Sequence, residues 1–499
     1  MAPKDTWPPA ITPRVQPIAW RLILGLAGVK LAAHLATDWQ YGFQRDELYY
    51  LDCARHLAWG FVDFPPVTPL IAFLDQLVLP GSLEGLRLAP ALAGAAVVVL
   101  AGLIARELGG DRLAQGLAAL AAAVSPMFLG ANLLFQTVTF DELTWGVVIY
   151  LLARLLRTGD RRLWLLVGAS FGVGLETKYQ VLMLCAGTAA GLLLTRERRQ
   201  LLTPWPWLGL AIAALLFAPN LWWQAQHGWA SLVYTRNHQA DIAQDPRYTY
   251  LLEQLLLFGP QLLPLAALAF GQLWRDARFR ALFWTAVVVE VGFLVVGGKS
   301  YYAGPIYTLL YAAGAVAAAS YLRRAWARRA AVAAAVAVTL VLSPLALPIL
   351  PASVIGSSGI WKARKDYADM FGWPALADQV AAVYGGLPAD QRASTVILAG
   401  NFGEAGAIDE YGPALRLPRA ASGHLSYWLW GPAQAAPKTV IAVGLPRDSL
   451  VTECGDVRQV GVIDMPYGIH NEEYGRPIFV CTQPKLSLAD WWPGQQHYS

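Results

Sequence analysis

Carboxylates and lysines recur in short polar segments that separate the apolar stretches of this chain. Asp46 and Glu47 lie in one such segment, Asp141 begins the apolar stretch after another, and Lys178 and Lys299 lie in two more. A carboxylate that faces a pocket can act as a general base on an acceptor hydroxyl or amine. An ammonium group is a compact point charge that suits a phosphate. These residue types therefore indicate group transfer from a phosphate-bearing substrate, provided that the fold brings them together.

Each of these residues also has a purely structural alternative. Asp46 and Glu47 are adjacent, so their side chains point in different directions and only one is expected to face a common cavity. Asp141 could cap a helix N-terminus, a position that Asp favours. The carboxylates could instead bind a divalent metal, so metal dependence stays open. Arg236, in a longer polar loop, is a third candidate for phosphate contact. The residues expected to line the substrate pocket beside these groups are Tyr49, Tyr50, Glu142, Tyr301 and Tyr302.

Several function classes have no support in the sequence. There is no Walker motif, no G-x-S-x-G elbow and no H-E-x-x-H helix. The formal net charge of +4 is small and dispersed, which does not favour nucleic acid as a partner. The histidines show no metal-ligand spacing.

The elements that must position the charged residues are membrane-spanning helices. Hydrophobic residues make up 56% of the chain and charged residues only 14%, against about 25% charged in soluble domains. A span needs about 20 mostly apolar residues. Residues 66–79 form a shorter apolar run between prolines and are expected to be re-entrant or interfacial. The predicted spans are about 18–36, 88–106, 113–131, 141–157, 163–177, 180–195, 205–222, 251–272, 280–297, 303–321 and 330–350.

The distribution of arginine supports this assignment and orients it. Short cytoplasmic loops are enriched in Lys and Arg. Every second predicted loop is rich in arginine, as in residues 154–162, 196–199 and 323–329. Eleven spans with the N-terminus in the cytoplasm then place residues 351–499 outside, together with Asp46, Lys178 and Lys299. A phosphate-bearing substrate at that face should be carried by a lipid.

Residues 351–499 are expected to form a small α/β domain after a transmembrane domain of residues 1–350. Strands are predicted at Ser394–Leu398, Thr439–Val443 and Ile478–Cys481, and a helix near 374–384. The glycine-rich run at 400–406 lacks dinucleotide-loop spacing and is interpreted as a turn. A disulfide between Cys454 and Cys481 is permitted if this part lies outside the cytosol, with free thiols as the alternative.

Several motifs resemble the dolichyl-phosphate-mannose protein mannosyltransferase-like superfamily, whose bacterial members include aminoarabinose transferases. The most specific is Arg45-Asp46-Glu47-Leu48-Tyr49-Tyr50 followed by Asp63-Phe64-Pro65-Pro66. The supporting matches are Phe140-Asp141-Glu142, Gly174-Leu175-Glu176-Thr177-Lys178-Tyr179, Lys299-Ser300-Tyr301-Tyr302, and residues 400–406 and 422–432.

The resemblance implies a GT-C fold: a helical membrane core, outer-face interfacial helices at about 45–80, and an extracytoplasmic domain. It implies transfer of one sugar from a polyprenyl phosphate donor to a lipid, glycan or protein acceptor at the outer face of a bacterial cytoplasmic membrane. Asp46 matches the essential acidic residue, Glu47 could replace it, and Asp141 matches a second acidic residue. The expected mechanism is inverting, with Asp46 as the base and Lys178, Lys299 and Arg236 at the donor phosphate.

One position departs from the aminoarabinose branch, and two other functions compete. That branch carries a basic residue before the Pro-Pro pair, where this chain has Phe64, so phosphate contact must come from other cations. The main alternative is a transporter or flippase of a lipid-linked sugar, which would place polar residues through the spans. The second is a non-catalytic assembly subunit, which would leave the clustered charges unexplained. The grouping of charges at one face favours the enzyme.

Overall fold

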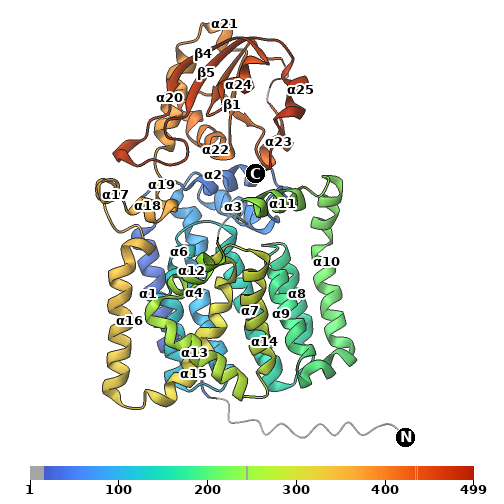
Figure 1. The fold of residues 1–499 in the computed structure, drawn as a ribbon, viewed down its shortest axis with the longest axis vertical. Coiled ribbons are helices and arrows are strands. Elements are labelled where there is room, and N and C mark those ends of the chain that lie inside the picture. Colours follow the sequence, from blue (N-terminus) through green and yellow to red (C-terminus); the bar gives the residue numbers. More distant parts are fainter. Residues whose placement is uncertain (1–15, 243–245, 433, 435, 499) are drawn as a thin grey trace.

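The computed structural model of the chain describes residues 16–242, 246–432, 434 and 436–498. A bundle of long helices forms one end of the molecule, and a small β-sheet with short helices forms the other (Figure 1). Short helices lie between these two parts. The N-terminal helix begins at the end of the bundle that faces away from the sheet.

Each stretch predicted to span the membrane coincides with one helix or with two consecutive helices. The pairs are α5 (Arg112–Val124) with α6 (Pro126–Asn132), α12 (Arg247–Phe258) with α13 (Leu263–Arg275), and the 3-10 helix η3 (Ser300–Ile306) with α15 (Tyr307–Tyr321). The single helices are α1 (Trp20–Thr37), α4 (Leu83–Glu107), α7 (Thr137–Thr158), α8 (Leu163–Leu175), α9 (Val181–Leu193), α10 (Pro204–Gln226), α14 (Arg280–Val296) and α16 (Ala325–Ala346).

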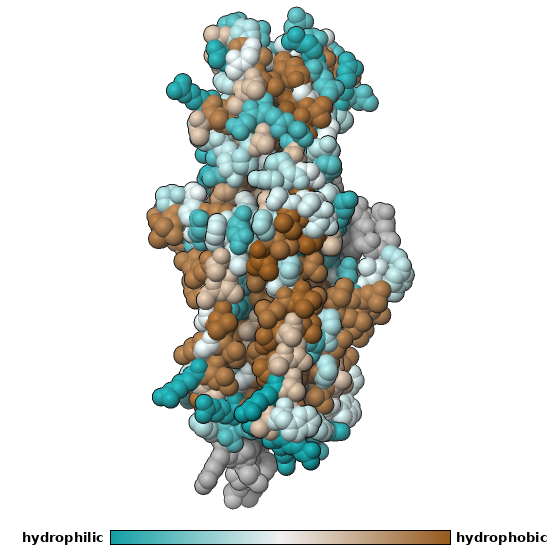
Figure 2. Space-filling model, turned by 90° about the vertical axis from the view of Figure 1, so that its left-hand side faces the viewer, coloured by the Kyte–Doolittle hydropathy of each residue, from teal (hydrophilic) through white to brown (hydrophobic). Residues whose placement is uncertain are grey.

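The bundle has the surface of a multi-pass membrane protein. By length and composition, four helices in the described part of the chain can each cross a membrane: α4, α10, η3 with α15, and α16. The number becomes six if two bent pairs each count as one span: α5 with α6, bent by 55°, and α12 with η2 (Pro260–Leu262) and α13, bent by 78°. Figure 2 shows hydrophobic residues over the bundle on one face and hydrophilic residues at its far end.

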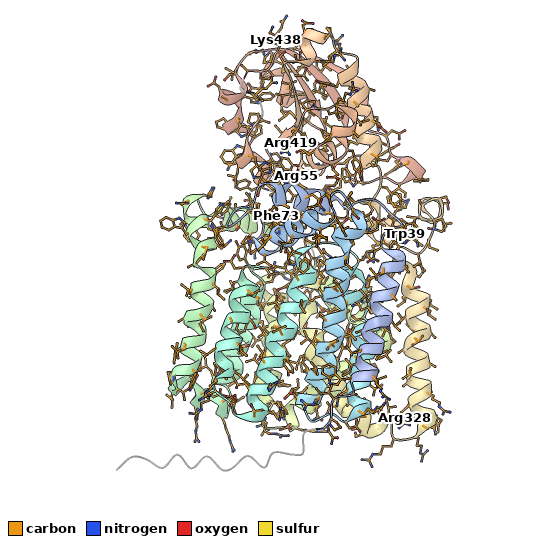
Figure 3. The ribbon with its side chains drawn as sticks, turned by 180° about the vertical axis from the view of Figure 1, so that it is seen from behind. Trp39, Arg55, Phe73, Arg328, Arg419 and Lys438 are labelled. Atoms are coloured by element: carbon orange, nitrogen blue, oxygen red, sulfur yellow. A yellow bond between two sulfur atoms is a disulfide. The ribbon has the colours of Figure 1, made fainter. Side chains whose placement is uncertain are left out.

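The arginine-rich loops lie at the end of the bundle opposite the sheet. The turn between α15 and α16 lies there (Figure 1), and Figure 3 shows Arg328 at the same end while Lys438 lies at the far end of the sheet. Arg157 and Arg106 both pair with the buried Glu107, at 2.5 and 2.9 Å. The charge asymmetry read from the sequence is therefore an asymmetry of the folded molecule.

Three short helices cover the end of the bundle nearest the sheet: α2 (Arg45–Arg55), α3 (Val67–Val78) and α11 (Ala230–Ile242) (Figure 1). Residues 66–79, predicted to be re-entrant or interfacial, form α3. The connection from α16 to the sheet runs through α17 (Ala352–Ser358), α18 (Ile360–Ala363) and α19 (Lys365–Ala368).

The sheet has five strands in the order β2-β1-β3-β5-β4. The strand β1 (Thr395–Ala399) pairs parallel with β2 (Ala420–Ser422) and with the central β3 (Thr439–Val443), whereas β5 (Pro477–Pro484) runs antiparallel to β3 and β4 (Cys454–Val462). The predicted strands coincide with β1, β3 and β5. The other two were missed because β2 has three residues and β4 is a mostly exposed strand at the sheet edge.

Short helices surround this sheet, and a disulfide links two of its strands. The predicted helix near 374–384 is α20 (Trp373–Gly385). The glycine-rich run at 400–406 was wrongly predicted to be a turn: residues 402–406 form the first part of α22 (Phe402–Tyr411), because Asn401 Oδ1 caps the helix by accepting the N–H groups of Gly403 and Glu404 at 2.8 and 3.0 Å. Cys454 and Cys481 form a disulfide between β4 and β5. The remaining short helices are α21 (Ala389–Arg392), α23 (Ser426–Trp430), α24 (Arg447–Val451) and α25 (Leu488–Trp491).

Candidate active site

A cavity of about 490 Å³ lies where the bundle meets the sheet part. Most of the predicted site residues line it, although they come from segments far apart in the sequence. These are Asp46, Tyr49, Tyr50, Lys178, Lys299, Tyr301 and Tyr302. The sequence pattern therefore identified a group of side chains that the fold brings together.

Asp46 and Glu47 have different environments although they are neighbours in α2. Asp46 lines the cavity, and burial raises the pKa of its carboxyl while the charges of Arg45 and Lys299 lower it in part. Glu47 is fully buried on the opposite side, where its carboxylate accepts two N–H groups of Arg87 at 2.9 and 2.7 Å.

Glu47 also accepts two backbone N–H groups, from Phe135 at 2.9 Å and from Gln44 at 2.8 Å. The contact with Gln44 completes a capping box at the start of α2. All strong acceptor sites of Glu47 are thus used to fix α2 against α4 and the loop before α7. The prediction that Glu47 could act in catalysis is not supported, because a helix turns each residue by 100° and Glu47 faces away from the cavity.

Lys178 and Lys299 enter the cavity from two different hairpins. The Nζ of Lys178 lies 5.3 Å from the ring centre of Tyr301 and 5.1 Å from that of Tyr302, which are cation–π distances. Burial lowers the pKa of Lys178 to about 8; Asp141 opposes this shift and the charge of Lys299 adds to it. Two cations close enough to repel each other favour a ligand with negative charge.

Asp141 and Glu142 do not line the cavity, and this corrects the expectation that Glu142 does. The lining residues of α7 are Thr137 and Val138, and the two carboxyl groups lie one turn deeper in the bundle. Asp141 is 2% exposed and interacts electrostatically with Lys178. Glu142 accepts a hydrogen bond from Asn132 at 3.0 Å. Asp141 can therefore act on a substrate only through Lys178.

Arg236 is also misplaced by the sequence prediction. It lies on the exposed side of α11, whereas Tyr234, Thr235, His238 and Gln239 of the same helix line the cavity. The guanidinium of Arg247 packs against the lining residue Gly297, because a Cβ on Gly297 would lie 2.1 Å from it; this glycine has a φ of +74°. The stripe of polar residues four apart on α11 was the available signal for the face of this helix.

Asp63 is a second acidic group in the cavity that the sequence prediction left out of the site. Its Oδ1 accepts a hydrogen bond from the Tyr49 hydroxyl at 3.0 Å. Burial raises the pKa of Asp63 to about 8, with Asp46 adding to the shift and Tyr49 opposing it. Burial in the cavity therefore favours the protonated form of the Asp63 carboxyl. The motif containing Asp63 and the Pro-Pro pair was the signal that could have found it.

The sheet part closes the cavity from above. Phe402, His424 and Leu425 line it together with α2. The ring of Phe402 lies 4.9 Å from that of Tyr49, and the Ser426 N–H donates to the Tyr49 hydroxyl at 3.1 Å. The part of the chain after residue 372 thus supplies walls of the candidate site.

Ion pairs hold this roof on α2. Arg45 pairs with Glu472 at 2.6 Å. Arg55 contacts Asp52 at 2.7 Å and Glu410 at 2.8 Å, and the buried Asp52 also accepts a hydrogen bond from Tyr427. Figure 3 shows Arg55 at this junction. Contacts along the whole length of α2 therefore fix the roof relative to Asp46.

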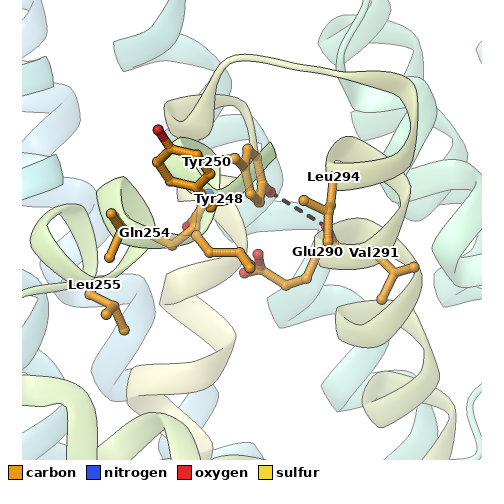
Figure 4. Close-up of a pocket in the computed structure, with 9 residues that line it drawn as sticks. Tyr248, Tyr250, Gln254, Leu255, Glu290, Val291 and Leu294 are labelled. Atoms are coloured by element: carbon orange, nitrogen blue, oxygen red, sulfur yellow. Dashed lines mark hydrogen bonds between the residues drawn. The ribbon is translucent and has the colours of Figure 1, made fainter. Parts of the chain in front are cut away.

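A second cavity, of about 520 Å³, opens on the side of the bundle between α12 and α14. Its walls are mostly apolar, with Leu251, Leu255 and Leu294 among them, and the Tyr250 hydroxyl reaches the Glu290 carbonyl at 3.5 Å (Figure 4). The helix α14 lines both cavities, since Phe293 and Val296 face the charged one. An apolar groove therefore lies beside the charged cavity. Among the described residues, no three His, Cys, Asp or Glu side chains are grouped to hold a metal ion.

Comparisons with solved structures agree with this architecture. The chain matches ArnT from Cupriavidus metallidurans in the apo state with a TM-score of 0.61 at 15% identity, over 93% of this chain and 98% of that one. The same protein bound to undecaprenyl phosphate gives 0.59 at 14% identity, over 94% and 99%. The chain has the fold of ArnT. A mostly helical fold like that of GT-C membrane proteins, with a small C-terminal sheet, is therefore confirmed, whereas the eleven spans and the separate soluble domain stay predictions.

Sequence comparisons also find similarity to glycosyltransferases. Residues 63–223 match the family model described as dolichyl-phosphate-mannose-protein mannosyltransferase, which confirms the predicted resemblance over that range. A lipid A galacturonosyltransferase, RgtD from Rhizobium johnstonii, is 27% identical over 271 residues, or 51% of this chain. The match spans about half of that relative, 54% of its length. Arabinofuranosyltransferase AftD from Mycobacteria matches with a TM-score of 0.55 at 15% identity, over 93% of this chain and 40% of that one.

The environment of Glu47 predicts a large stability effect for its partner. Replacing Arg87 by Met leaves a buried carboxylate without its counter-ion, which costs about 3–5 kcal/mol. The Arg87→Met/Glu47→Gln double variant keeps an acceptor for one of the two backbone N–H groups and removes the unpaired charge, so it should be more stable than the single variant. Thermal unfolding in detergent, followed by tryptophan fluorescence, measures both. A double variant no more stable than Arg87→Met would contradict the ion-pair assignment.

Proposed function

We propose that this protein is a membrane glycosyltransferase. It moves one sugar from a polyprenyl phosphate donor to an acceptor at the outer face of a bacterial cytoplasmic membrane. The observation that carries the proposal is the single cavity that joins the carboxylate Asp46 to the cations Lys178 and Lys299. The structure of ArnT bound to undecaprenyl phosphate supports a lipid-phosphate donor, and the similarity to a lipid A galacturonosyltransferase supports sugar transfer.

The apolar groove supports a donor of this kind. A polyprenyl chain needs an apolar surface at membrane depth, and burying hydrocarbon is favourable by about 25 cal/mol per Å². The groove between α12 and α14 supplies that surface beside the charged cavity. Ser300, next to Lys299, makes two hydrogen bonds with α12. Its hydroxyl donates to Glu253 at 2.5 Å, and its carbonyl accepts from Gln254 at 2.5 Å. These bonds connect the wall of the groove to the hairpin that carries Lys299. The lipid tail would thus lie in the groove while the phosphate reaches Lys178 and Lys299.

The proposed reaction is a single inverting displacement. Asp46 takes the proton of the acceptor hydroxyl or amine, whose oxygen or nitrogen forms a bond to the anomeric carbon of the sugar. The bond from that carbon to the phosphate oxygen breaks, and polyprenyl phosphate leaves with the electron pair. Lys178 and Lys299 stabilise the negative charge that develops on the phosphate, which is the main way in which preorganised sites lower barriers. The charge of Asp141 opposes the lowering of the Lys178 pKa that burial causes, which favours the charged ammonium.

The finer organisation of the chain belongs to the same proposal. Eleven spans in residues 1–350 place the N-terminus in the cytoplasm and the domain of residues 351–499 outside. The helices α2, α3 and α11 then lie at the outer surface of the membrane. The arginine-rich loops at the opposite end of the bundle support this orientation.

A donor panel tests the function directly. Purified protein in lipid nanodiscs receives radiolabelled polyprenyl phosphates that carry different sugars, together with envelope extracts as acceptors. We expect one label to move to an acceptor, and Asp46→Asn to slow this transfer by about 10²–10⁴-fold because the general base is lost. Asp160→Asn, an exposed carboxylate in a loop at the arginine-rich end, is the matched control and should transfer at the wild-type rate.

Other outcomes of the panel contradict parts of the proposal. Movement of intact lipid-linked sugar across the bilayer, with no new glycosidic product, would identify a flippase instead. Transfer by Asp46→Asn at the rate of Asp160→Asn would falsify the role of Asp46 and leave the transferase activity standing.

The raised pKa of Asp46 and the lowered pKa of Lys178 predict a bell-shaped dependence of kcat/KM on pH. The rate rises as Asp46 loses its proton and falls through about pH 8, where Lys178 loses its charge. Lys178→Arg keeps the positive charge at all these pH values, so we expect its alkaline limb to move up by at least about one pH unit. Asp63 also has a pKa of about 8, so Asp63→Asn is measured in parallel. A limb that stays in Lys178→Arg and moves in Asp63→Asn would assign it to Asp63.

The orientation is tested with single cysteines. In a background where Cys53 and Cys185 are replaced by Ala, we introduce Arg161→Cys at the arginine-rich end or Lys438→Cys in the sheet part; both positions are exposed. A membrane-impermeant thiol reagent should label Lys438→Cys in intact cells and Arg161→Cys only after permeabilisation. Labelling of both in intact cells, or the reverse pattern, would overturn the proposed topology.

A further inference from the structure

One buried side chain outside the cavity contacts three of the segments that line it. Gln224, near the end of α10, is 4% exposed and does not line the charged cavity. Its Nε2 lies 2.6 Å from Ser231 Oγ, 3.2 Å from the Tyr179 hydroxyl and 3.3 Å from the Phe61 carbonyl. Its Oε1 accepts the Ser231 N–H at 3.1 Å. A single amide therefore bonds to three separate parts of the chain.

Each contacted residue lies close to a wall of the cavity. Phe61 precedes Asp63 by two residues, in the loop between α2 and α3. Tyr179 follows Lys178 in the hairpin between α8 and α9 and itself lines the cavity. Ser231 lies near the start of α11, three residues before the lining residue Tyr234.

Neighbouring groups reinforce the same three contacts. The Tyr179 hydroxyl donates to Asn220 Oδ1 at 3.0 Å, and Asn220 Nδ2 donates to the Trp59 carbonyl at 2.9 Å. Ser231 Oγ also donates to the Phe61 carbonyl at 3.1 Å. A Cβ on Gly60 would lie 2.6 Å from the ring of Trp223, so this loop packs directly on α10. Gln224 therefore lies within a connected group of hydrogen bonds that joins α10 to these three segments.

We propose that Gln224 is a positioning residue for the lipid-phosphate site: it sets the distance between the Lys178 hairpin, the Asp63 loop and α11. The inference rests on the proposed function for its activity readout. The physical reason is that two lysines from two separate hairpins must reach one phosphate. The side chain of Lys178 can do so only if its hairpin is held at the right distance from that of Lys299. Misplacement of a catalytic or binding group by about 1 Å can cost about 10²-fold in rate.

The chain contains a matched control for this residue. Gln115, in α5, is also fully buried, and its side chain makes three hydrogen bonds: to the Ala19 N–H at 2.9 Å, the Pro17 carbonyl at 3.1 Å and the Gly110 carbonyl at 3.2 Å. It lies beside the arginine-rich loops, at the end of the bundle away from the cavity. Replacing either glutamine by Met keeps the volume of the side chain and removes its hydrogen bonds.

The experiment compares Gln224→Met with Gln115→Met in nanodiscs. Both should lower the melting temperature to a similar extent because both leave buried polar groups without partners. Only Gln224→Met should lower kcat, by about 10–100-fold, and weaken the binding of undecaprenyl phosphate, used as the probe, by about 10-fold. Hydrogen exchange should accelerate at residues 59–64, 176–181 and 231–235 in Gln224→Met and remain unchanged there in Gln115→Met.

Two results would overturn the inference. The first is Gln224→Met with wild-type kcat, probe affinity and exchange in the three segments. The second is equal loss of rate in both variants at equal loss of stability, which would make Gln224 a structural residue only. If the wild-type protein transfers no sugar, the proposed function fails, while exchange and probe binding still decide whether Gln224 aligns the three segments.

Discussion

The orientation of α2 is the constraint on which the candidate site depends. This helix has only 11 residues, too short to hold its own direction at the end of a bundle. The Glu47 carboxylate fixes it, because Arg87 from α4 and the backbone of Phe135 both bind that group in a buried position. With Glu47 held on one side, the turn of the helix leaves Asp46 no direction except the cavity.

Each buried charge of the cavity has an opposite charge nearby, but the two lysines also repel each other. Asp46 faces Arg45 and Lys299, and Lys178 has Asp141 beneath it, yet Lys178 and Lys299 still repel. Removing charges from water is expensive, so a protein retains such an arrangement where the charges act on something. A phosphate would relieve the repulsion between the lysines, and this electrostatic argument connects the geometry to the proposed donor.

The sequence predicted which stretches form the long helices and most of the residues that line the cavity, because hydropathy and arginine placement report which polar residues lie at the same end of the bundle. It could not rank Asp46 over Glu47. That ranking depends on Arg87, 40 residues away in the apolar α4, where a lone arginine gave no signal of its partner. Arg236 was misjudged because the loop that holds it forms the helix α11, and only the phase of that helix decides which residues face inward. Asp141 and Glu142 were expected in the pocket because they begin a predicted span, whereas α7 begins four residues earlier.

The sheet part was the least predictable element of the site, and its position decides how the cavity is reached. Phe402, His424 and Leu425 close the cavity on the side away from the helix bundle, and ion pairs along α2 hold them there. The apolar groove beside α14 opens sideways on the bundle. Under the proposed function, a donor with a lipid tail would approach from the bilayer through the groove. The acceptor must then pass along the boundary between the bundle and the sheet part. A roof that is ion-paired to the same helix as the base would place acceptor selection and proton removal on one rigid element.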